Sequence, residues 1–139
     1  MPKQFPLAST GFNPFGDLIG LSFSQCEKGF SRCSLQVTDR LHNPNGVLHG
    51  GVIYSLADTG MGGALYTDLN EDESCATVEI SIVYFAPVTF GTLTCETKVV
   101  HRSKKIAVLE SEVKNDGRLV AKAVGTYSVF RASVQKGRT

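Results

Sequence analysis

The chain has 139 residues, of which 42% are hydrophobic and 19% are charged, and these proportions are typical of a globular protein without low-complexity tracts. This length suits one domain that spans residues 1–139 and has a hydrophobic core of its own. The formal net charge of +1 gives no strongly basic surface, so we expect no nucleic-acid partner.

The cysteines and histidines are not spaced as a metal site or a disulfide framework. Cys33 and Cys95 fall in strand-like runs, where a free thiol behaves as a small apolar residue. Residues 1–6 lack the apolar core of an export signal. The only candidate membrane span, residues 47–67, contains Asp58 and several glycines. We therefore expect a reduced, cytoplasmic protein with no metal and no membrane-spanning segment.

The N-terminal part predicts a short helical turn followed by a hairpin. Asn13 suits the N-cap and Pro14 suits the first helical position, which predicts a turn of helix over residues 13–18. Apolar residues then alternate with polar ones on both sides of a turn at residues 27–29. This period of two predicts a pair of antiparallel strands.

The central part predicts an irregular loop over residues 39–48 and then one long helix that begins near Gly50. From there, apolar residues recur at helical spacing. They are Val52, Ile53, Leu56, Met61, Ala64 and Leu65. Gly60, Gly62 and Gly63 weaken the helix propensity and are tolerable where another part of the backbone packs closely.

The C-terminal half predicts four strands joined by short turns, as an antiparallel meander. Residues 76–85 alternate strictly between two faces, residues 101–105 form a basic turn, and Asn115-Asp116-Gly117 is a strong hairpin signal. The last strand is expected over residues 118–130, and the polar tail 131–139 is expected to fray. The predicted fold class is α+β, with a curved antiparallel sheet of about six strands wrapped around one long central helix.

The central helix carries two groups of chemical interest. Asp58 is an acid in apolar surroundings, which is costly unless it is paired or used. Gly50 opens the helix, where free amide N–H groups and the helix dipole would polarise a carbonyl oxygen. Eight residues separate them, or about 12 Å along the axis. One helix cannot bring both to the same carbonyl, but an antiparallel helix of a second subunit could, with two identical sites by symmetry.

Structural interpretations of the same residues remain open. Asp58 can be a structural aspartate bonded to hydroxyls such as those of Ser55 or Thr59. His49 can be a loop or capping residue rather than a base, and the basic turn can be a solvated hairpin tip, although Arg and Lys also suit phosphate. The sequence contains no dinucleotide-binding, phosphate-loop or serine-nucleophile motif.

The run from Asn43 through His49-Gly50-Gly51 to Ser55-Leu-Ala-Asp58 resembles the hot-dog-fold acyl-CoA thioesterases, and within them the phenylacetate-degradation (PaaI-type) branch. The resemblance extends from the Asn-Pro-Phe near the start to the strand that follows the helix, and so covers most of the chain. It implies the hot-dog fold and hydrolysis of an aryl- or medium-chain acyl-CoA to free acid and coenzyme A. No cofactor is implied beyond the coenzyme A of the substrate, and the implied assembly is a dimer of dimers.

The resemblance also implies roles for matching positions. Asp58 is the nucleophile or the general base on water, and the Gly50 backbone N–H polarises the thioester carbonyl. Asn43 helps to place the thioester or the water, His49 binds near the sulfur, and the Thr77 hydroxyl is supplied to the other subunit's site. The basic turn is an expected contact for the coenzyme A phosphates. Its residues are Arg102, Ser103, Lys104 and Lys105.

The acyl group and two other functions stay open at this point. Tyr54, Met61, Tyr66 and Phe85 are candidates for shaping an acyl pocket. One alternative is a non-catalytic hot-dog module that binds acyl-CoA. The other is a hydroxyacyl-thioester dehydratase, although such enzymes rely on a histidine where this helix offers Asp58.

Overall fold

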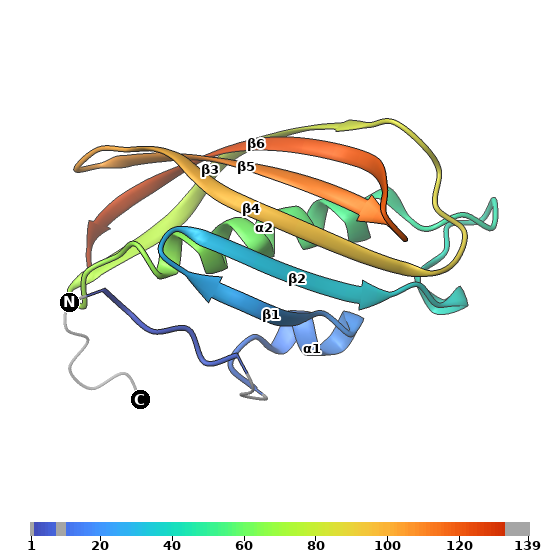
Figure 1. Cartoon of the computed structure of the whole chain (residues 1–139), viewed down its shortest axis with the longest axis horizontal. Coiled ribbons are helices and arrows are strands. Elements are labelled where there is room, and N and C mark those ends of the chain that lie inside the picture. The colour runs from blue at the N-terminus through green and yellow to red at the C-terminus, as the bar shows by residue number, and fades with distance from the viewer. Residues whose placement is uncertain (1, 8–10, 133–139) are drawn as a thin grey trace.

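A computed structural model describes residues 2–7 and 11–132 and contains one sheet and one long helix (Figure 1). The helical segments are α1 (Pro14–Ile19), the 3-10 turn η1 (Asp39–Leu41) and α2 (Gly50–Tyr66). The strands are β1 (Ser22–Glu27), β2 (Phe30–Gln36), β3 (Glu73–Tyr84), β4 (Thr92–Arg102), β5 (Ile106–Asn115) and β6 (Arg118–Arg131). The predicted α+β class, with six antiparallel strands and one central helix, is confirmed.

The strand order in the sheet is β1-β2-β4-β5-β6-β3, and every neighbouring pair is antiparallel. The predicted meander is therefore wrong for β3, which pairs with the last strand instead of with β4. The chain leaves β3 and crosses through residues 85–91 to the middle of the sheet, where β4 pairs with β2. This crossing places β3 at an edge, and α2 lies inside the curve of the sheet (Figure 1).

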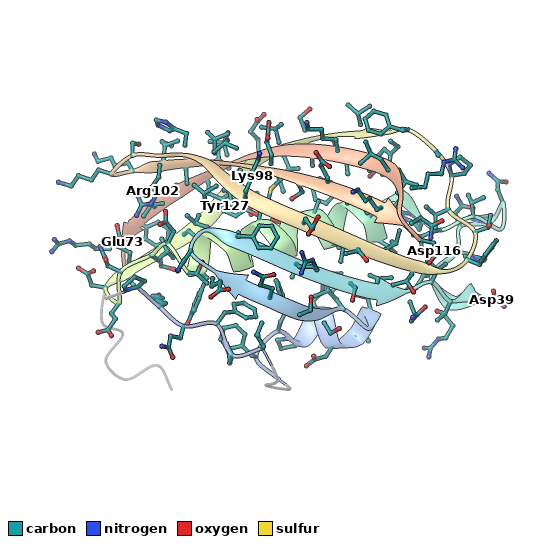
Figure 2. All side chains as sticks on the ribbon, in the orientation of Figure 1. Asp39, Glu73, Lys98, Arg102, Asp116 and Tyr127 are labelled. Atoms are coloured by element: carbon teal, nitrogen blue, oxygen red, sulfur yellow. The ribbon has the colours of Figure 1, made fainter. Side chains whose placement is uncertain are left out.

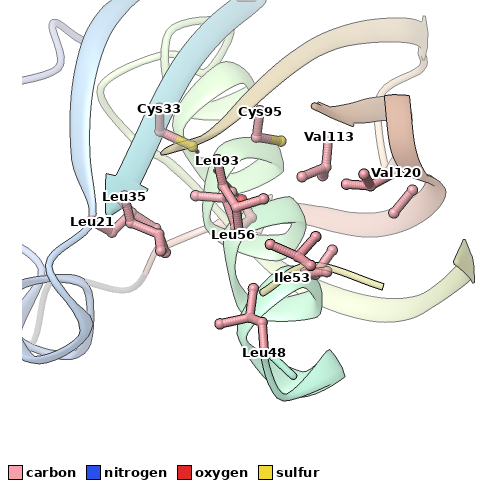
Figure 3. Packing of buried hydrophobic residues seen from close by; sticks show 12 residues of the cluster. Leu21, Cys33, Leu35, Leu48, Ile53, Leu56, Leu93, Cys95, Val113 and Val120 are labelled. Atoms are coloured by element: carbon pink, nitrogen blue, oxygen red, sulfur yellow. Dashed lines mark hydrogen bonds between the residues drawn. The ribbon is translucent and has the colours of Figure 1, made fainter. Parts of the chain in front are cut away.

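The inner face of the sheet and one side of α2 form the core (Figure 3). The predicted apolar side of the helix is confirmed. Five of its six predicted residues are buried, and the sixth, Val52, is half-buried. Leu93, Cys95 and Thr97 alternate inward along β4, and the buried Cys33 confirms that its thiol packs as a small apolar group. Leu119 is 40% exposed although Ala121 and Ala123 of the same strand are buried, because the pairing of β5 with β6 shifts beside it.

Hydroxyl groups from the sheet fix α2 by bonding to its backbone. Ser31 donates to the Gly60 carbonyl at 2.6 Å, and Ser111 donates to the Ala57 carbonyl at 3.4 Å. A Cβ atom at Gly60 would lie 2.8 Å from Thr97 Oγ1, so this glycine allows a close approach of the sheet, although by side chains rather than by the backbone that the sequence predicted. The helix is thus held at a fixed height and rotation over the strands.

The edge strand β3 departs from the predicted alternation. Its register shifts between Thr77 and Glu79, and Val78 is 60% exposed within that irregularity. Val83 and Tyr84 are also exposed. A long edge with exposed apolar side chains is a surface that favours association with another strand.

Two further predictions concern the ends of the chain and the membrane. Residues 133–139, most of the tail predicted to fray, lie outside the described residues, but Arg131 belongs to β6 and its guanidinium is 3.6 Å from the Asp72 carboxylate. In residues 2–7 and 11–132, no helix has the length and apolarity that crossing a membrane requires.

Candidate active site

Asp58 lies in the middle of α2, where two hydroxyl groups reach the same carboxylate oxygen. Thr77 donates to Asp58 Oδ1 at 3.0 Å, and the Tyr127 hydroxyl also donates to Oδ1 and lies 3.0 Å from the Asp58 carbonyl oxygen. Thr77 on β3 and Tyr127 on β6 are paired across the two strands. Oδ2 accepts no hydrogen bond from the described residues, so it is the oxygen available for chemistry.

Two predictions about Asp58 need correction. The side chain is half-buried rather than enclosed in apolar surroundings, and Ser55 does not bond to it but donates to the Gly51 carbonyl at 2.7 Å. Thr77 bonds to Asp58 of its own chain, because the pairing of β3 with β6 carries Thr77 over the middle of the helix. Its predicted contribution to a site shared with another subunit stays a prediction.

Tyr127 is a site residue that the sequence did not connect with Asp58. Burial raises the pKa of its hydroxyl well above the usual range, and the bond to the Asp58 carboxylate adds to this effect. The phenol therefore stays protonated near neutral pH and acts as a hydrogen-bond donor. One signal existed, because a tyrosine on the buried face of a strand needs a partner for its hydroxyl. Figure 2 marks its position above the helix.

The first turn of α2 forms the second part of the candidate site. His49 is the N-cap, and its Nδ1 accepts a hydrogen bond from the Gly51 N–H at 2.8 Å, so the neutral ring carries its proton on Nε2. The capping interpretation of His49 is thus confirmed. Tyr84 donates to the Gly50 carbonyl at 2.8 Å. The Gly50 N–H finds no acceptor in the described part of the chain, which leaves it free for a ligand.

Asn43 organises the loop that leads to the helix. Its Oδ1 accepts from the Asn45 N–H at 2.9 Å and is 3.4 Å from the Val47 nitrogen, and its own backbone N–H donates to the Val47 carbonyl at 2.7 Å. These bonds close a tight turn just before His49. The side-chain oxygen is occupied, so Asn43 can offer a ligand only its amide N–H groups.

The two parts open into separate grooves of one chain. The groove beside Asp58 has a volume of about 350 Å³ and includes Tyr66 and Tyr127, whereas the groove beside Gly50 has a volume of about 250 Å³ and includes Tyr84 and Phe85. They share no lining residue, which agrees with the separation of about 12 Å along the helix. Each chain therefore presents the two candidate groups in two separate grooves.

The acyl-pocket candidates divide between these grooves and the core. Tyr66 lines the groove beside Asp58, and Phe85 lines the groove beside Gly50. Met61 is fully buried in the core and contacts neither groove, and Tyr54 is 36% exposed on the outer side of the helix. Of these four candidates, only Tyr66 is placed to contact a group bound next to Asp58.

Residues of the basic turn differ in their contacts, and Figure 2 labels Arg102 and Glu73, which bond to each other. Arg102 belongs to β4 rather than to the turn, and its guanidinium bonds to the Glu73 carboxylate at 3.0 and 3.2 Å. The Asn70 N–H and Arg102 together lower the pKa of Glu73. Arg102 is therefore engaged within the chain, and its contact with the coenzyme A phosphates stays a prediction.

The rest of the turn stays available. Ser103 closes it through bonds with the Ile106 backbone, and Lys104 and Lys105 are exposed. The two lysines line a groove of about 750 Å³ between β5, β6 and the start of β3. Their contact with coenzyme A phosphates stays a prediction.

Comparison with protein-family models matches residues 45–122 to the thioesterase superfamily. Among curated relatives, the chain is 29% identical to a 1,4-dihydroxy-2-naphthoyl-CoA hydrolase of Listeria monocytogenes, over 72% of this chain and 81% of that protein. It is 27% identical to the medium/long-chain acyl-CoA thioesterase YigI of Salmonella typhimurium, over 84% of this chain and 85% of that protein.

Solved structures give the same result for the fold. The thioesterase HI1161 of Haemophilus influenzae superposes with a TM-score of 0.85 at 25% identity and covers 93% of both chains. A mutant of the phenylacetic acid degradation protein PaaI of Thermus thermophilus superposes with a TM-score of 0.78 at 26% identity, over 84% of this chain and 98% of that one.

Proposed function

Because the chain belongs to the thioesterase superfamily, we propose that it hydrolyses an aryl- or medium-chain acyl-CoA thioester to the free acid and coenzyme A. The single observation that carries this proposal is the Asp58 carboxylate, whose Oδ1 accepts hydrogen bonds from two hydroxyls and which lines a groove. The names of the Listeria and Salmonella relatives support a coenzyme A ester, and the similarity to PaaI supports that branch of the family.

The proposed site joins Asp58 of one subunit with Gly50 of another. The thioester oxygen accepts a hydrogen bond from the free Gly50 N–H, which stabilises the negative charge that develops on it. The Asn43 amide and His49 Nε2 lie in the same loop and are proposed to hold the water and the thioester sulfur. Two antiparallel α2 helices related by a two-fold axis form two such sites, and the exposed apolar residues of β3 support this association. We propose a dimer of dimers as the full assembly.

The Asp58 carboxylate can act in hydrolysis as a nucleophile or as a general base. As a nucleophile, Asp58 Oδ2 attacks the carbonyl carbon, the C–S bond breaks, and water hydrolyses the resulting anhydride. As a general base, Asp58 takes a proton from water while the water oxygen attacks, and the proton then goes to the departing thiolate. A single turnover in oxygen-18 water separates them, since label enters the Asp58 carboxylate only along the nucleophilic route.

The remaining proposals concern the coenzyme A and the location of the protein. Lys104 and Lys105 are proposed to contact the phosphates, without Arg102, because Arg102 already pairs with Glu73. The reaction needs water and the thioester and no further cofactor. All four cysteines are free thiols, which supports a cytoplasmic location.

The test of the proposed function is thiol release from a panel of aryl-, short-, medium- and long-chain acyl-CoA esters, followed with a thiol reagent. We expect release from at least one aryl or medium-chain ester. Saturable binding without thiol release from any ester would favour an acyl-CoA-binding module instead. Loss of water from a 3-hydroxyacyl-CoA without thiol release would favour a dehydratase.

Tyr127→Phe is expected to lower turnover about tenfold while the Michaelis constant changes little. The substitution keeps the buried ring but removes the hydroxyl that orients the Asp58 carboxylate, and hydrogen bonds to charged groups contribute about 1.5–3 kcal/mol. The measurement is steady-state thiol release with the best ester of the panel. Ser24→Ala is the control, because it removes an exposed hydroxyl of β1 that does not line the groove beside Asp58. Equal turnover of Tyr127→Phe and wild type would show that the hydroxyl does not serve Asp58.

A further inference from the structure

The groove beside Asp58 has a polar end and an aromatic end. Asp58, Thr77 and Tyr127 form the polar end. At the aromatic end, the Phe5 ring lies with its centroid 4.4 Å from that of Phe23 and 5.8 Å from that of Tyr66. A group attached to a carbonyl at Asp58 would extend along the helix toward these rings.

Phe5 comes from the N-terminal segment rather than from the sheet or the helix. That segment is fixed by the Lys3 N–H, which donates to the Leu69 carbonyl at 3.1 Å, and by a β-bridge between Pro2 and Asn70. The Lys3 ammonium also lies 5.2 Å from the centre of the Tyr66 ring. Phe5 is therefore held as a wall of the groove by contacts that do not involve its own ring.

Gly62 forms the floor between the two ends. It lies four residues from Asp58 on α2, which is about 6 Å along the axis, and Tyr66 lies about 6 Å further. A Cβ atom at Gly62 would meet no heavy atom within 4 Å, whereas one at Gly63 would lie 2.6 Å from the Phe23 ring. Of these two neighbouring glycines, only Gly62 leaves open space, and that space is part of the groove.

We propose that Gly62 and Phe5 determine which acyl group this protein accepts, an inference that rests on the proposed thioesterase function. Gly62 leaves open space in the groove, and the Phe5 ring lines its aromatic end. The aromatic end favours a planar ring, because ring edges and faces attract one another in tilted and T-shaped contacts. A long straight chain would meet the Phe5 ring before its end was accommodated.

Both residues can be changed without disturbing the core. Leucine at position 62 replaces a glycine in a helix, which raises the helix propensity, and its side chain enters the groove. Alanine at Phe5 removes a half-buried ring of the N-terminal segment and lengthens the groove. Gly62→Leu therefore reduces the space in the groove, and Phe5→Ala increases it.

The experiment compares kcat/KM for acetyl-, benzoyl- and decanoyl-CoA in the wild type, Gly62→Leu and Phe5→Ala. We expect Gly62→Leu to lower the ratio of benzoyl- to acetyl-CoA about tenfold or more, since small changes of volume in an apolar pocket have effects of this size. We expect Phe5→Ala to raise the ratio of decanoyl- to benzoyl-CoA about tenfold. Phe90→Ala, which truncates a ring that is 74% exposed, is the control and should leave both ratios unchanged.

Unchanged ratios in both variants, or an equal loss with all three esters, would overturn the proposal. A separate measurement distinguishes this failure from failure of the proposed function. The Kd of a non-hydrolysable benzyl thioether of coenzyme A is measured by calorimetry. We expect Gly62→Leu to raise this Kd about tenfold. If the wild type releases no thiol but Gly62→Leu still weakens binding of the thioether, the assignment of the groove is supported and the proposed hydrolysis is wrong. If binding is equal in both proteins, the groove assignment is wrong.

Discussion

Replacing Asp58 with asparagine is expected to lower thioester hydrolysis by about three orders of magnitude or more, with the fold intact. Asparagine keeps an oxygen that can accept from Thr77 and Tyr127, so the local hydrogen bonds can persist. It cannot take a proton from water or attack a carbonyl, and a positioned base alone contributes about 10²–10⁴-fold. The measurement is single-turnover thiol release, beside near-UV circular dichroism and the thermal unfolding midpoint.

Asp39→Asn is the matched control for this substitution. Asp39 begins the 3-10 turn, and its side chain is fully exposed, so the same chemical change there should leave turnover unaltered. Asp58→Asn with wild-type turnover would exclude both the nucleophilic and the general-base route. The free Oδ2 would then have only a structural role.

Replacing Gly50 with proline is expected to lower kcat/KM by about 10²–10³-fold, because it removes the N–H proposed to polarise the carbonyl. The position can accept proline. It is the first residue of α2, where proline is common, and His49 before it has φ −61° and ψ 130°, which suits a residue that precedes proline. Gly50→Ala keeps the N–H and places its Cβ 3.4 Å from the Tyr84 ring, so this control should lose far less.

Mixing the two defective chains tests whether the half-sites of different subunits combine. A dimer of one Asp58→Asn chain and one Gly50→Pro chain has one site with both defects and one site with neither. Random pairing from co-expression should therefore restore about a quarter of the wild-type activity. Failure to recover any activity, with mixed dimers shown by native mass spectrometry, would mean that both groups act within one chain.

The sequence predicted those parts of the fold and site that depend on near neighbours along the chain. The start of α2, the Asn13 N-cap and the β5–β6 hairpin follow from local spacing and turn residues, and all three agree with the structure. The position of β3 could not be predicted in this way. Its pairing with β6 is decided by the packing of the whole sheet, which a period of two does not specify.

The same limit explains which contacts of the candidate site the sequence did not predict. Tyr127 is 69 residues from Asp58 in the sequence, and only the β3–β6 pairing brings its hydroxyl to the carboxylate. The engagement of Arg102 by Glu73 is also a consequence of strand positions, since the two residues are 29 apart. Gly50 and Asp58 could be identified because both lie on one helix, where the spacing fixes their separation.

Gly60 and Gly62 lie two residues apart on α2 and differ in what limits their replacement. A side chain at Gly60 would meet Thr97 Oγ1 at 2.8 Å, whereas one at Gly62 would meet no heavy atom within 4 Å. Packing therefore restricts replacement of Gly60, whereas the neighbouring atoms leave Gly62 free to be replaced. Under the proposed function, single replacements at Gly62 would alter the range of acyl groups that the protein accepts without a loss of stability.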